Sequence, residues 1–583
     1  MKIIGINAFH ADSSACLVVD GKLISAVEEE RFNRIKHWAG FPINSIKYCL
    51  KSSNLEISDI DHISINIDPK ANYFKKFLFL IQHRPSLNLI FRKIKKKQKY
   101  NSIINLIDKE FGSRKFKGEI NHIEHHYAHL SSAFHVSPFK EACILSVDGF
   151  GDFASTAWGY GQNEKISLDQ KIYFPHSLGI FYQSMTQYLG FKNYGDEYKI
   201  MGLAPYGKPA YVNDLKKILL IQEKGIFKLN LDFYKFYKEN FNYRWENGIV
   251  EIDDLYSNKL TELFGIERKK TEPLNQFHKD LAHSTQKVYE EAFLNILHNL
   301  YNKYQNDNLC IAGGCGMNSV ANGKIKNQTK FKNIYIQPAA GDAGGSIGAA
   351  FTTHFKNLNN KRSFQMKHAY WGTSFNDNEI LECLNKNNQK IIDEKCTFEK
   401  ITDDKTLNST VAKAITEGKV VGWFQGRMEW GPRALGNRSI LGDPRRSDMK
   451  DILNLKIKRR ESFRPFAPSI LREHVKDWFE NDDEVPFMMK VYQIKENKRS
   501  EIPAVTHVDG SGRLQTVYKE TNQKYYDLIK EFYDLTKIPL LLNTSFNENE
   551  PIVSNPKEAL ECFLRTKMDM IVLNNYLVTR QNN

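Results

Sequence analysis

Two histidines and two aspartates in this 583-residue chain have the types and positions expected of a metal site. In E-H-H-Y-A-H-L-S-S-A-F-H, His125 and His129 are four residues apart, so on a helix both imidazoles point the same way and can share one cation. Asp148 follows an apolar run and Asp342 stands in a glycine-rich turn, where each could supply an oxygen ligand. Two nitrogens and two oxygens suit Fe, Zn or Mn. The alternative is a pair of exposed helix histidines, which an isolated H-x-x-x-H pattern favours.

A second group of residues suits an anion. A stretch of the carboxy-terminal half reads Q-G-R-M-E-W-G-P-R-A-L-G-N-R-S-I-L, and F-R-P-F-A-P follows it. Arg433 and Arg464 each lie beside proline and apolar residues, where an unpaired charge is costly to bury and a bound oxyanion would satisfy the guanidinium fork. A solvated basic surface explains three nearby residues equally well. These are Lys456, Arg459 and Arg460.

Short apolar strands joined by polar turns must position these groups. Lys2–Ala8 is followed by the turn F-H-A-D-S-S and by two apolar runs that meet at Asp20-Gly21, a strong hairpin signal. The same order of strand, acidic turn and strand returns from Cys143 to Gly159. Asn308–Ala312 and Ile334–Ile336 each end in a glycine-rich turn, whose backbone amides can approach an anion before a helix begins. A duplicated unit of this form resembles the actin-like ATPase fold of sugar kinases and heat-shock chaperones.

Length, composition and charge narrow the class of protein. A chain of 583 residues with 41% hydrophobic and 26% charged residues predicts at least two globular cores and excludes disordered and fibrous classes. The 82 Lys and Arg exceed the 68 Asp and Glu by 14, which favours an anionic partner without choosing among phosphates, nucleic acid and a membrane surface. Part of the excess is the run Arg92–Lys99, and such runs are more often a solvated face.

No apolar stretch reaches the length of a membrane span, and the eight scattered cysteines contain no C-x-x-C pair. We therefore expect a cytoplasmic protein without a membrane partner. The polar segment Thr352–Ser363 marks a domain boundary, which predicts domains at residues 1–355 and 365–583. Apolar strands alternate with helical patterns in both, so the expected fold class is α/β throughout.

Taken together, the motifs resemble those of the O-carbamoyltransferase family, which carbamoylates hydroxyls of antibiotics, nodulation factors and related sugars. The resemblance covers nearly the whole chain. It rests on G-I-N-A-F-H-A-D-S-S-A, E-E-E-R-F-N-R-I-K-H, H-H-Y-A-H-L-S-S-A-F, G-D-E-Y-K-I-M-G-L-A-P-Y-G, A-G-G-C-G-M-N, G-D-A-G-G-S-I-G-A-A, G-P-R-A-L-G-N-R-S-I-L, F-R-P-F-A-P and L-L-N-T-S-F-N.

The resemblance implies an actin-like (duplicated ribonuclease-H-like) domain that binds metal and nucleotide, followed by a YrdC-like α/β domain that processes carbamoyl phosphate. It implies a metal, usually iron, at His125, His129, Asp148 and Asp342. It implies ATP, with Mg²⁺, near Gly313, Gly314, Asn318, Gly341 and Gly344. Carbamoyl phosphate is expected at Arg433, Lys458, Arg464, Arg513 and Ser545, with Asn543 adding a neutral hydrogen bond.

In the reaction that the resemblance implies, carbamate from carbamoyl phosphate attacks ATP to give carbamoyl-adenylate, and the metal domain transfers the carbamoyl group to a hydroxyl. His10 is the candidate base for the hydroxyl proton, Asp12 its orienting partner, and Lys36 lines the same cleft. The alternatives are a turn pair for His10 and Asp12 and a surface ion pair for Lys36.

The sequence does not indicate which molecule accepts the carbamoyl group. We expect a sugar or a sugar-bearing natural product. One rival is an enzyme of the tRNA threonylcarbamoyl-adenosine synthase type, although no stripe of aromatic and basic residues predicts a nucleic-acid partner. Another is a nucleotide-binding sensor without turnover. The sequence does not decide between a monomer and a homodimer.

Overall fold

The computed structural model describes every residue except 84, 86–102, 239–242, 247–248, 357–359 and 582–583. The basic run Arg92–Lys99 thus lies outside the described residues. The chain divides into two compact units. The first consists of Met1–Glu30 and Ile35–Met366, and the second of Arg31–Arg34 and Lys367–Asn583.

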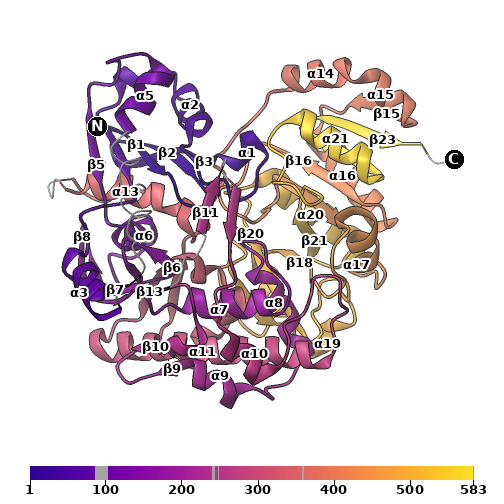
Figure 1. Ribbon diagram of the computed structural model, residues 1–583. Helices are drawn as coiled ribbons and strands as arrows, with labels where there is room; N and C mark the ends of the chain where they lie inside the picture. The colour runs from indigo at the N-terminus through magenta and orange to yellow at the C-terminus, as the bar shows by residue number, and fades with distance from the viewer. Residues whose placement is uncertain (84, 86–102, 239–242, 247–248, 357–359, 582–583) are drawn as a thin grey trace. The chain divides into compact units, whose positions relative to one another are not determined.

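The first unit contains the same sheet twice (Figure 1). The strand orders are β3-β2-β1-β4-β5 and β8-β7-β6-β13-β14, and in each sheet three antiparallel strands are extended by two parallel ones. This repeated order defines a duplicated ribonuclease-H-like unit, so the predicted actin-like fold class is confirmed. The strands are β1 (Lys2–Asn7), β2 (Ser14–Val19), β3 (Lys22–Glu28), β4 (His62–Ile65), β5 (Glu119–His122), β6 (Glu141–Gly151), β7 (Ala154–Gln162), β8 (Lys165–Tyr173), β13 (Asn308–Ala312) and β14 (Asn333–Ile336).

The two predicted hairpins differ in where they turn. The first turns at Asp20 and Gly21, whose φ angles of 47° and 75° suit a tight hairpin, as expected. The second does not turn at D-G-F-G, because β6 continues through these residues to Gly151. The β6–β7 register shifts between Val147 and Gly151. Asp148 therefore lies on an irregular part of a strand rather than after its end, and a bulge of this kind redirects side chains near a functional site.

Helices α6 (His125–Phe134) and α13 (Gly345–His354) pack against each other between the two sheets of this unit. A methyl group on Gly348 would lie 1.7 Å from the carbonyl oxygen of Ala128, and one on Gly5 would lie 2.0 Å from that of Ser346. Only glycine allows such close backbone contact. The position of α6 is thereby fixed against β1 through α13.

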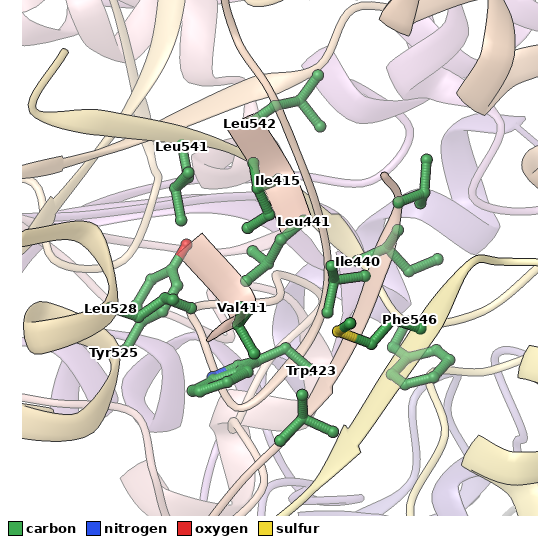
Figure 2. Close-up of a cluster of buried hydrophobic side chains, with 14 of the residues drawn as sticks. Val411, Ile415, Trp423, Ile440, Leu441, Tyr525, Leu528, Leu541, Leu542 and Phe546 are labelled. Carbon is green, nitrogen blue, oxygen red and sulfur yellow. The ribbon is translucent and has the colours of Figure 1, made fainter. Parts of the chain in front are cut away.

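The second unit is built on one mixed sheet of order β15-β23-β22-β16-β17-β21-β18-β20-β19. The apolar faces of helices α16 (Asp404–Thr416), α20 (Gln523–Thr536) and α21 (Pro556–Thr566) belong to the core of this unit. Figure 2 shows side chains of α16 and α20 in this core, together with residues of the sheet. Such an α/β sheet agrees in class with the YrdC-like expectation. The strands are β15 (Cys396–Lys400), β16 (Val421–Phe424), β17 (Arg438–Gly442), β18 (Ala467–Leu471), β19 (Lys490–Gln493), β20 (Ser511–Val517), β21 (Leu540–Ser545), β22 (Met570–Leu573) and β23 (Tyr576–Arg580).

A short amino-terminal segment completes the second unit. Arg34 donates to the carbonyl oxygens of Pro551 (2.5 Å) and Ile552 (2.8 Å) and pairs with Glu558 at 3.0 Å. These bonds explain why Arg31–Arg34, part of the E-E-E-R-F-N-R motif, belongs with residues more than 500 positions away.

Candidate functional site

Helix α6 places His125 and His129 one turn apart, and both rings are fully buried. Their Nε2 atoms lie 3.1 Å from each other. Asp148 from β6 and Asp342 from the short helix after β14 point at the same position. The structure therefore brings all four predicted ligands together.

The separations of the four donor atoms fit a metal ion. Asp148 Oδ2 lies 3.1 Å from the Nε2 of His125 and 3.4 Å from that of His129, and Asp342 Oδ1 lies 3.5 Å from each. A tetrahedral site with bonds of about 2.1 Å has donor atoms about 3.4 Å apart. A cation would also compensate two carboxylates that are otherwise costly to bury side by side.

Each carboxylate uses its second oxygen for a neighbour. Asp148 Oδ1 accepts the backbone N–H of Gly314 at 2.9 Å, which ties this predicted metal ligand to a glycine-rich turn. Asp342 Oδ2 lies 3.5 Å from the Nδ1 of His10, whose ring also stacks on His125 with centroids 5.3 Å apart. Asp148 thus contacts the predicted nucleotide site, and Asp342 contacts the predicted base.

The charges of the cluster shift the pKa values of its members. Burial raises the pKa of Asp148, but hydrogen bonds from His125 and His129 outweigh burial and hold this pKa well below its ordinary value. Burial and the charge of Asp148 raise the pKa of Asp342, and bonds from His10 and His129 reverse this shift, so the net direction is downward. Both carboxylates are therefore ionised, which is the form that binds a cation.

Packing rather than an outer hydrogen bond orients the His125 ring. Among the described residues, neither His125 nor His129 has a hydrogen-bond partner for Nδ1, whereas metal-bound imidazoles usually have one. Instead the ring of His125 lies against Gly151 so closely that a methyl group there would be 2.0 Å from it. Asp152 completes the support by accepting the backbone N–H of His125 at 2.9 Å.

Two glycine-rich turns lie side by side next to the predicted metal ligands. The Cβ position of Gly341 is 4.0 Å from the Cα of Gly314, so the turns after β13 and β14 face each other. Gly313 has a φ of 89°, and a methyl group there would lie 2.2 Å from a backbone oxygen of β6. Gly344 is equally crowded, and Asn318 caps the following helix α12 (Ser319–Gln328) by accepting the N–H of Ala321. The predicted nucleotide residues thus form one glycine-lined cradle.

The structure separates the predicted pair of His10 and Asp12. Asp12 bonds His37 Nδ1 at 2.8 Å, whereas His10 faces Asp342. His10 therefore pairs with Asp342, which the sequence analysis named only as a metal ligand, and not with Asp12. Lys36 is exposed and adjoins His37 in the sequence.

The sequence did not predict a role for His37, although the residue ends the quoted motif E-E-E-R-F-N-R-I-K-H. The turn of residues 37–40 holds the loop of residues 9–13 with backbone bonds as well as this ion pair. Phe9 N–H donates to Gly40 O at 3.0 Å, and Ser13 N–H donates to Trp38 O at 2.8 Å. The loop carrying His10 is thereby fixed from one side.

In the second unit, three guanidiniums gather around that of Arg513. Burial lowers the pKa of Arg513 well below its ordinary value, and three neighbouring positive charges lower it further. These charges belong to Arg433, Arg460 and Arg464. Among the described residues, the Nε of Arg513 has no hydrogen-bond partner. Such a cluster is favourable when an anion neutralises it.

Other predicted residues of the second unit have different surroundings. The Lys458 ammonium is bound by the carbonyl and hydroxyl oxygens of Ser545 and by two oxygens of Asn547, so it fixes the turn after β21. Asn543 donates to Ala434 O at 3.1 Å and to the Oγ of Ser469 at 2.9 Å, deep in the sheet. These side chains position the loop rather than project freely from it.

Not every arginine of the glycine-rich stretch faces the cluster. Arg438 is fully buried, donates to carbonyl oxygens including that of Gln425 at 2.6 Å, and lies over the ring of Phe424. Arg427 donates to Trp371 O at 2.6 Å. Both bonds are structural, and no sequence pattern distinguishes these arginines from Arg433.

The family follows from comparison with known proteins. Residues 2–351 match the family model described as the carbamoyltransferase N-terminus, and residues 412–580 match the carbamoyltransferase C-terminus. The chain therefore belongs to the carbamoyltransferase family, as the motifs predicted, and is a carbamoyltransferase enzyme.

Two relatives are similar over nearly the whole chain. An uncharacterized protein, sll1178, from Synechocystis sp. is 40% identical, with 99% of this chain and 96% of that protein aligned. The nodulation protein NolNO of Sinorhizobium fredii is 38% identical over 99% of this chain and 80% of that protein. Among solved structures, T. kodakarensis HypF matches distantly, with 13% identity, a TM-score of 0.30 and coverage of 61% of this chain and 48% of that one.

Because Gly151 sets the orientation of His125, Gly151→Ala should weaken metal binding without removing a ligand. The added methyl group cannot fit beside the ring, so we expect the affinity for Fe²⁺ or Zn²⁺ to fall by about tenfold or more, as for loss of an outer-shell contact. Isothermal titration with either ion measures this. Gly149→Ala is the control, because a methyl group there meets nothing within 4 Å. Equal affinities for the two variants would contradict this explanation.

The ion pair of His37 predicts a pH dependence of stability. Burial lowers the pKa of His37, but Asp12 and Glu30 raise it to about 9. Since the pKa in the folded state exceeds that of the unfolded chain, near 6.5, the pair stabilises the fold fully below pH 6.5 and loses this effect as pH rises through 9. The difference in melting temperature between wild type and His37→Gln should therefore shrink from pH 6 to pH 9.5.

Thermal scanning at several pH values measures that difference. His122→Gln removes an exposed histidine of the same unit and serves as the control. A difference that widens with pH, or that matches the control at every pH, would show that the pair does not hold the loop.

Proposed function

We propose that the protein is an ATP-dependent O-carbamoyltransferase that moves the carbamoyl group of carbamoyl phosphate, through carbamoyl-adenylate, to a hydroxyl of a sugar or sugar-bearing natural product. The observation that carries this proposal is the convergence of two buried imidazoles and two carboxylates on one point beside a glycine-lined cradle. Fe²⁺ is the proposed ion, since two nitrogens and two oxygens suit it. A divalent ion held by these residues would supply a Lewis acid for the carbonyl under attack.

The guanidinium cluster of the second unit supports the first stage. Arg433, Arg464 and Arg513 would bind the phosphate of carbamoyl phosphate and neutralise its charge as it leaves. Water adds to the carbonyl carbon, the bond to the phosphate oxygen breaks, and carbamate and phosphate result. A carbamate oxygen then attacks the α-phosphorus of ATP, pyrophosphate leaves, and carbamoyl-adenylate forms.

In the second stage the acceptor hydroxyl attacks the carbonyl carbon of the adenylate. The carbon–oxygen bond to AMP breaks, and the carbamate ester and AMP are the products. His10 would take the hydroxyl proton, because its imidazole lies beside the ligand cluster. Asp342 Oδ2, 3.5 Å from its Nδ1, would stabilise the resulting imidazolium. The nucleotide would lie in the cradle of Gly313, Gly314, Asn318, Gly341 and Gly344.

Substitution of one cluster arginine tests the first stage. Arg464→Ala should slow pyrophosphate release from ATP and carbamoyl phosphate by about tenfold or more, because one charge-assisted hydrogen bond is worth about 1.5–3 kcal/mol. A coupled pyrophosphate assay with Fe²⁺ and Mg²⁺ measures this rate. Arg472→Ala is the matched control, since Arg472 lies in the same unit and pairs with Asp482 at 2.5 Å.

A normal rate for Arg464→Ala would reject the proposed anion site. Pyrophosphate release that requires added bulk tRNA would favour a tRNA-modifying enzyme instead. No release by the wild-type protein with any combination of these substrates and ions would favour a sensor without turnover.

A further inference from the structure

Two arginines in the motif E-E-E-R-F-N-R-I-K-H belong to the second unit, although the residues on both sides of Arg31–Arg34 belong to the first. Arg31 lies in the short helix α1 (Glu30–Asn33), and Arg34 directly follows this helix. Arg31 is only 3% exposed, so its guanidinium requires polar partners inside the protein. The proposed reaction gives neither arginine a task, but their contacts indicate one.

Arg31 contacts the loop that carries one arginine of the anion cluster. Its guanidinium donates to the carbonyl oxygen of Gly431 at 3.1 Å, and Gly431 lies two positions before Arg433. Beyond Arg433, one carboxylate oxygen of Glu429 accepts three backbone N–H groups between residues 435 and 438. Arg31 therefore fixes this loop on the amino-terminal side of Arg433, and Glu429 fixes it on the other side.

Arg34 holds the turn that follows strand β21. This turn begins after Ser545, and a backbone bond of 3.0 Å from Val553 to Phe546 closes it. Arg34 donates to the carbonyl oxygens of residues 551 and 552, at 2.5 Å and 2.8 Å, inside the turn. Because Ser545 is a predicted carbamoyl phosphate residue, Arg34 supports the second loop of the predicted anion site.

The two loops meet at the same end of the sheet. In the antiparallel pair of β17 and β21, Ser439 lies opposite Ser545. Just outside this pair, Phe546 N–H donates to Arg438 O at 2.9 Å. The chain thus enters β17 from the Arg433 loop at the point where it leaves β21 for the second loop. Two arginines three positions apart can therefore reach one loop each.

Repulsion within the anion cluster explains why such support is needed. Burial and the positive charges of Arg433, Arg460 and Arg464 lower the pKa of Arg513 well below its ordinary value, which shows how closely these charges lie together. Without an anion, the repulsion favours positions in which the guanidiniums lie farther apart. Bringing them back together would then cost part of the binding free energy. Fixed loops avoid this cost.

We propose that Arg31 and Arg34 are positioning residues of the carbamoyl phosphate site. They act through the loop of Arg433 and the turn after Ser545, which they hold in the arrangement that binds the phosphate group. Arginine suits this task, because its planar guanidinium donates to several oxygens in fixed directions. The inference rests on the proposed function, since it requires carbamoyl phosphate to bind at these loops.

Titration calorimetry of the full-length protein with carbamoyl phosphate, in the absence of ATP, tests the proposal. Arg31→Met and Arg34→Met remove the guanidinium and keep an unbranched side chain. Each should raise the Kd for carbamoyl phosphate about tenfold, because the loop it holds is then misplaced. Arg34→Lys keeps a charged donor and should recover part of the loss. Arg580→Met is the matched control, because Arg580 also donates to two carbonyl oxygens and pairs with a glutamate in the second unit.

The steady-state constants distinguish positioning from general support of the fold. In the pyrophosphate assay, the KM for carbamoyl phosphate should rise about tenfold in Arg31→Met and Arg34→Met, while the KM for ATP stays unchanged. Arg580→Met should leave both constants as in the wild type, even where its melting temperature falls as far as that of Arg34→Met. Should Arg34→Met fail to fold, Arg34→Lys and Arg31→Met provide the same test.

Each contrary result has a distinct meaning. Wild-type affinity for carbamoyl phosphate in both methionine variants would overturn the positioning role and leave the proposed function in place. Equal weakening by Arg580→Met, or an equal rise in the KM for ATP, would show that the two arginines only stabilise the fold. No binding of carbamoyl phosphate by the wild-type protein would reject the anion site itself, and this inference with it.

Discussion

Two aspartates, one buried and one largely buried, organise the first unit, because the two oxygens of each carboxylate have different partners. Asp148 and Asp342 direct one oxygen to the two imidazoles of α6, and the other to Gly314 or to His10. Neither carboxylate could be buried at this distance from the other without compensating positive charge. Asp148 contacts the glycine-lined cradle and Asp342 contacts the proposed base His10. A substitution in the cluster of His125, His129, Asp148 and Asp342 is therefore expected to disturb both the cradle and the base.

The duplicated fold explains how distant parts of the chain meet at this cluster. Asp148 comes from the first strand of the second sheet, and His10 follows the first strand of the first sheet, so the two occupy corresponding places in the repeat. Helix α6 connects the two sheets in sequence and contributes both histidines. The second unit instead concentrates positive charge, because it brings several guanidiniums together, and a bound anion would neutralise them. The four predicted metal ligands thus all belong to the first unit, and the arginines around Arg513 all belong to the second.

Sequence reasoning predicted the elements and residues that depend on local spacing. The i, i+4 histidines, the hairpin at Asp20-Gly21 and the glycine-rich turns follow from short-range geometry, and the structure has all of them. The sequence did not predict contacts that depend on tertiary packing. The pairing of Asp12 with His37 and the continuation of β6 past Asp148 depend on neighbours far along the chain. Arg438 likewise resembled its neighbours in sequence but is buried against Phe424.

X-ray absorption spectroscopy of the protein loaded with Fe²⁺ would test the metal cluster most directly. Our account predicts one ion per chain, with nitrogen and oxygen neighbours at about 2.1 Å and outer-shell scattering from two imidazoles. It also predicts that His129→Ala removes the signal of one imidazole. A spectrum with sulfur neighbours, or with oxygen neighbours alone in the wild-type protein, would contradict the assignment of these four side chains.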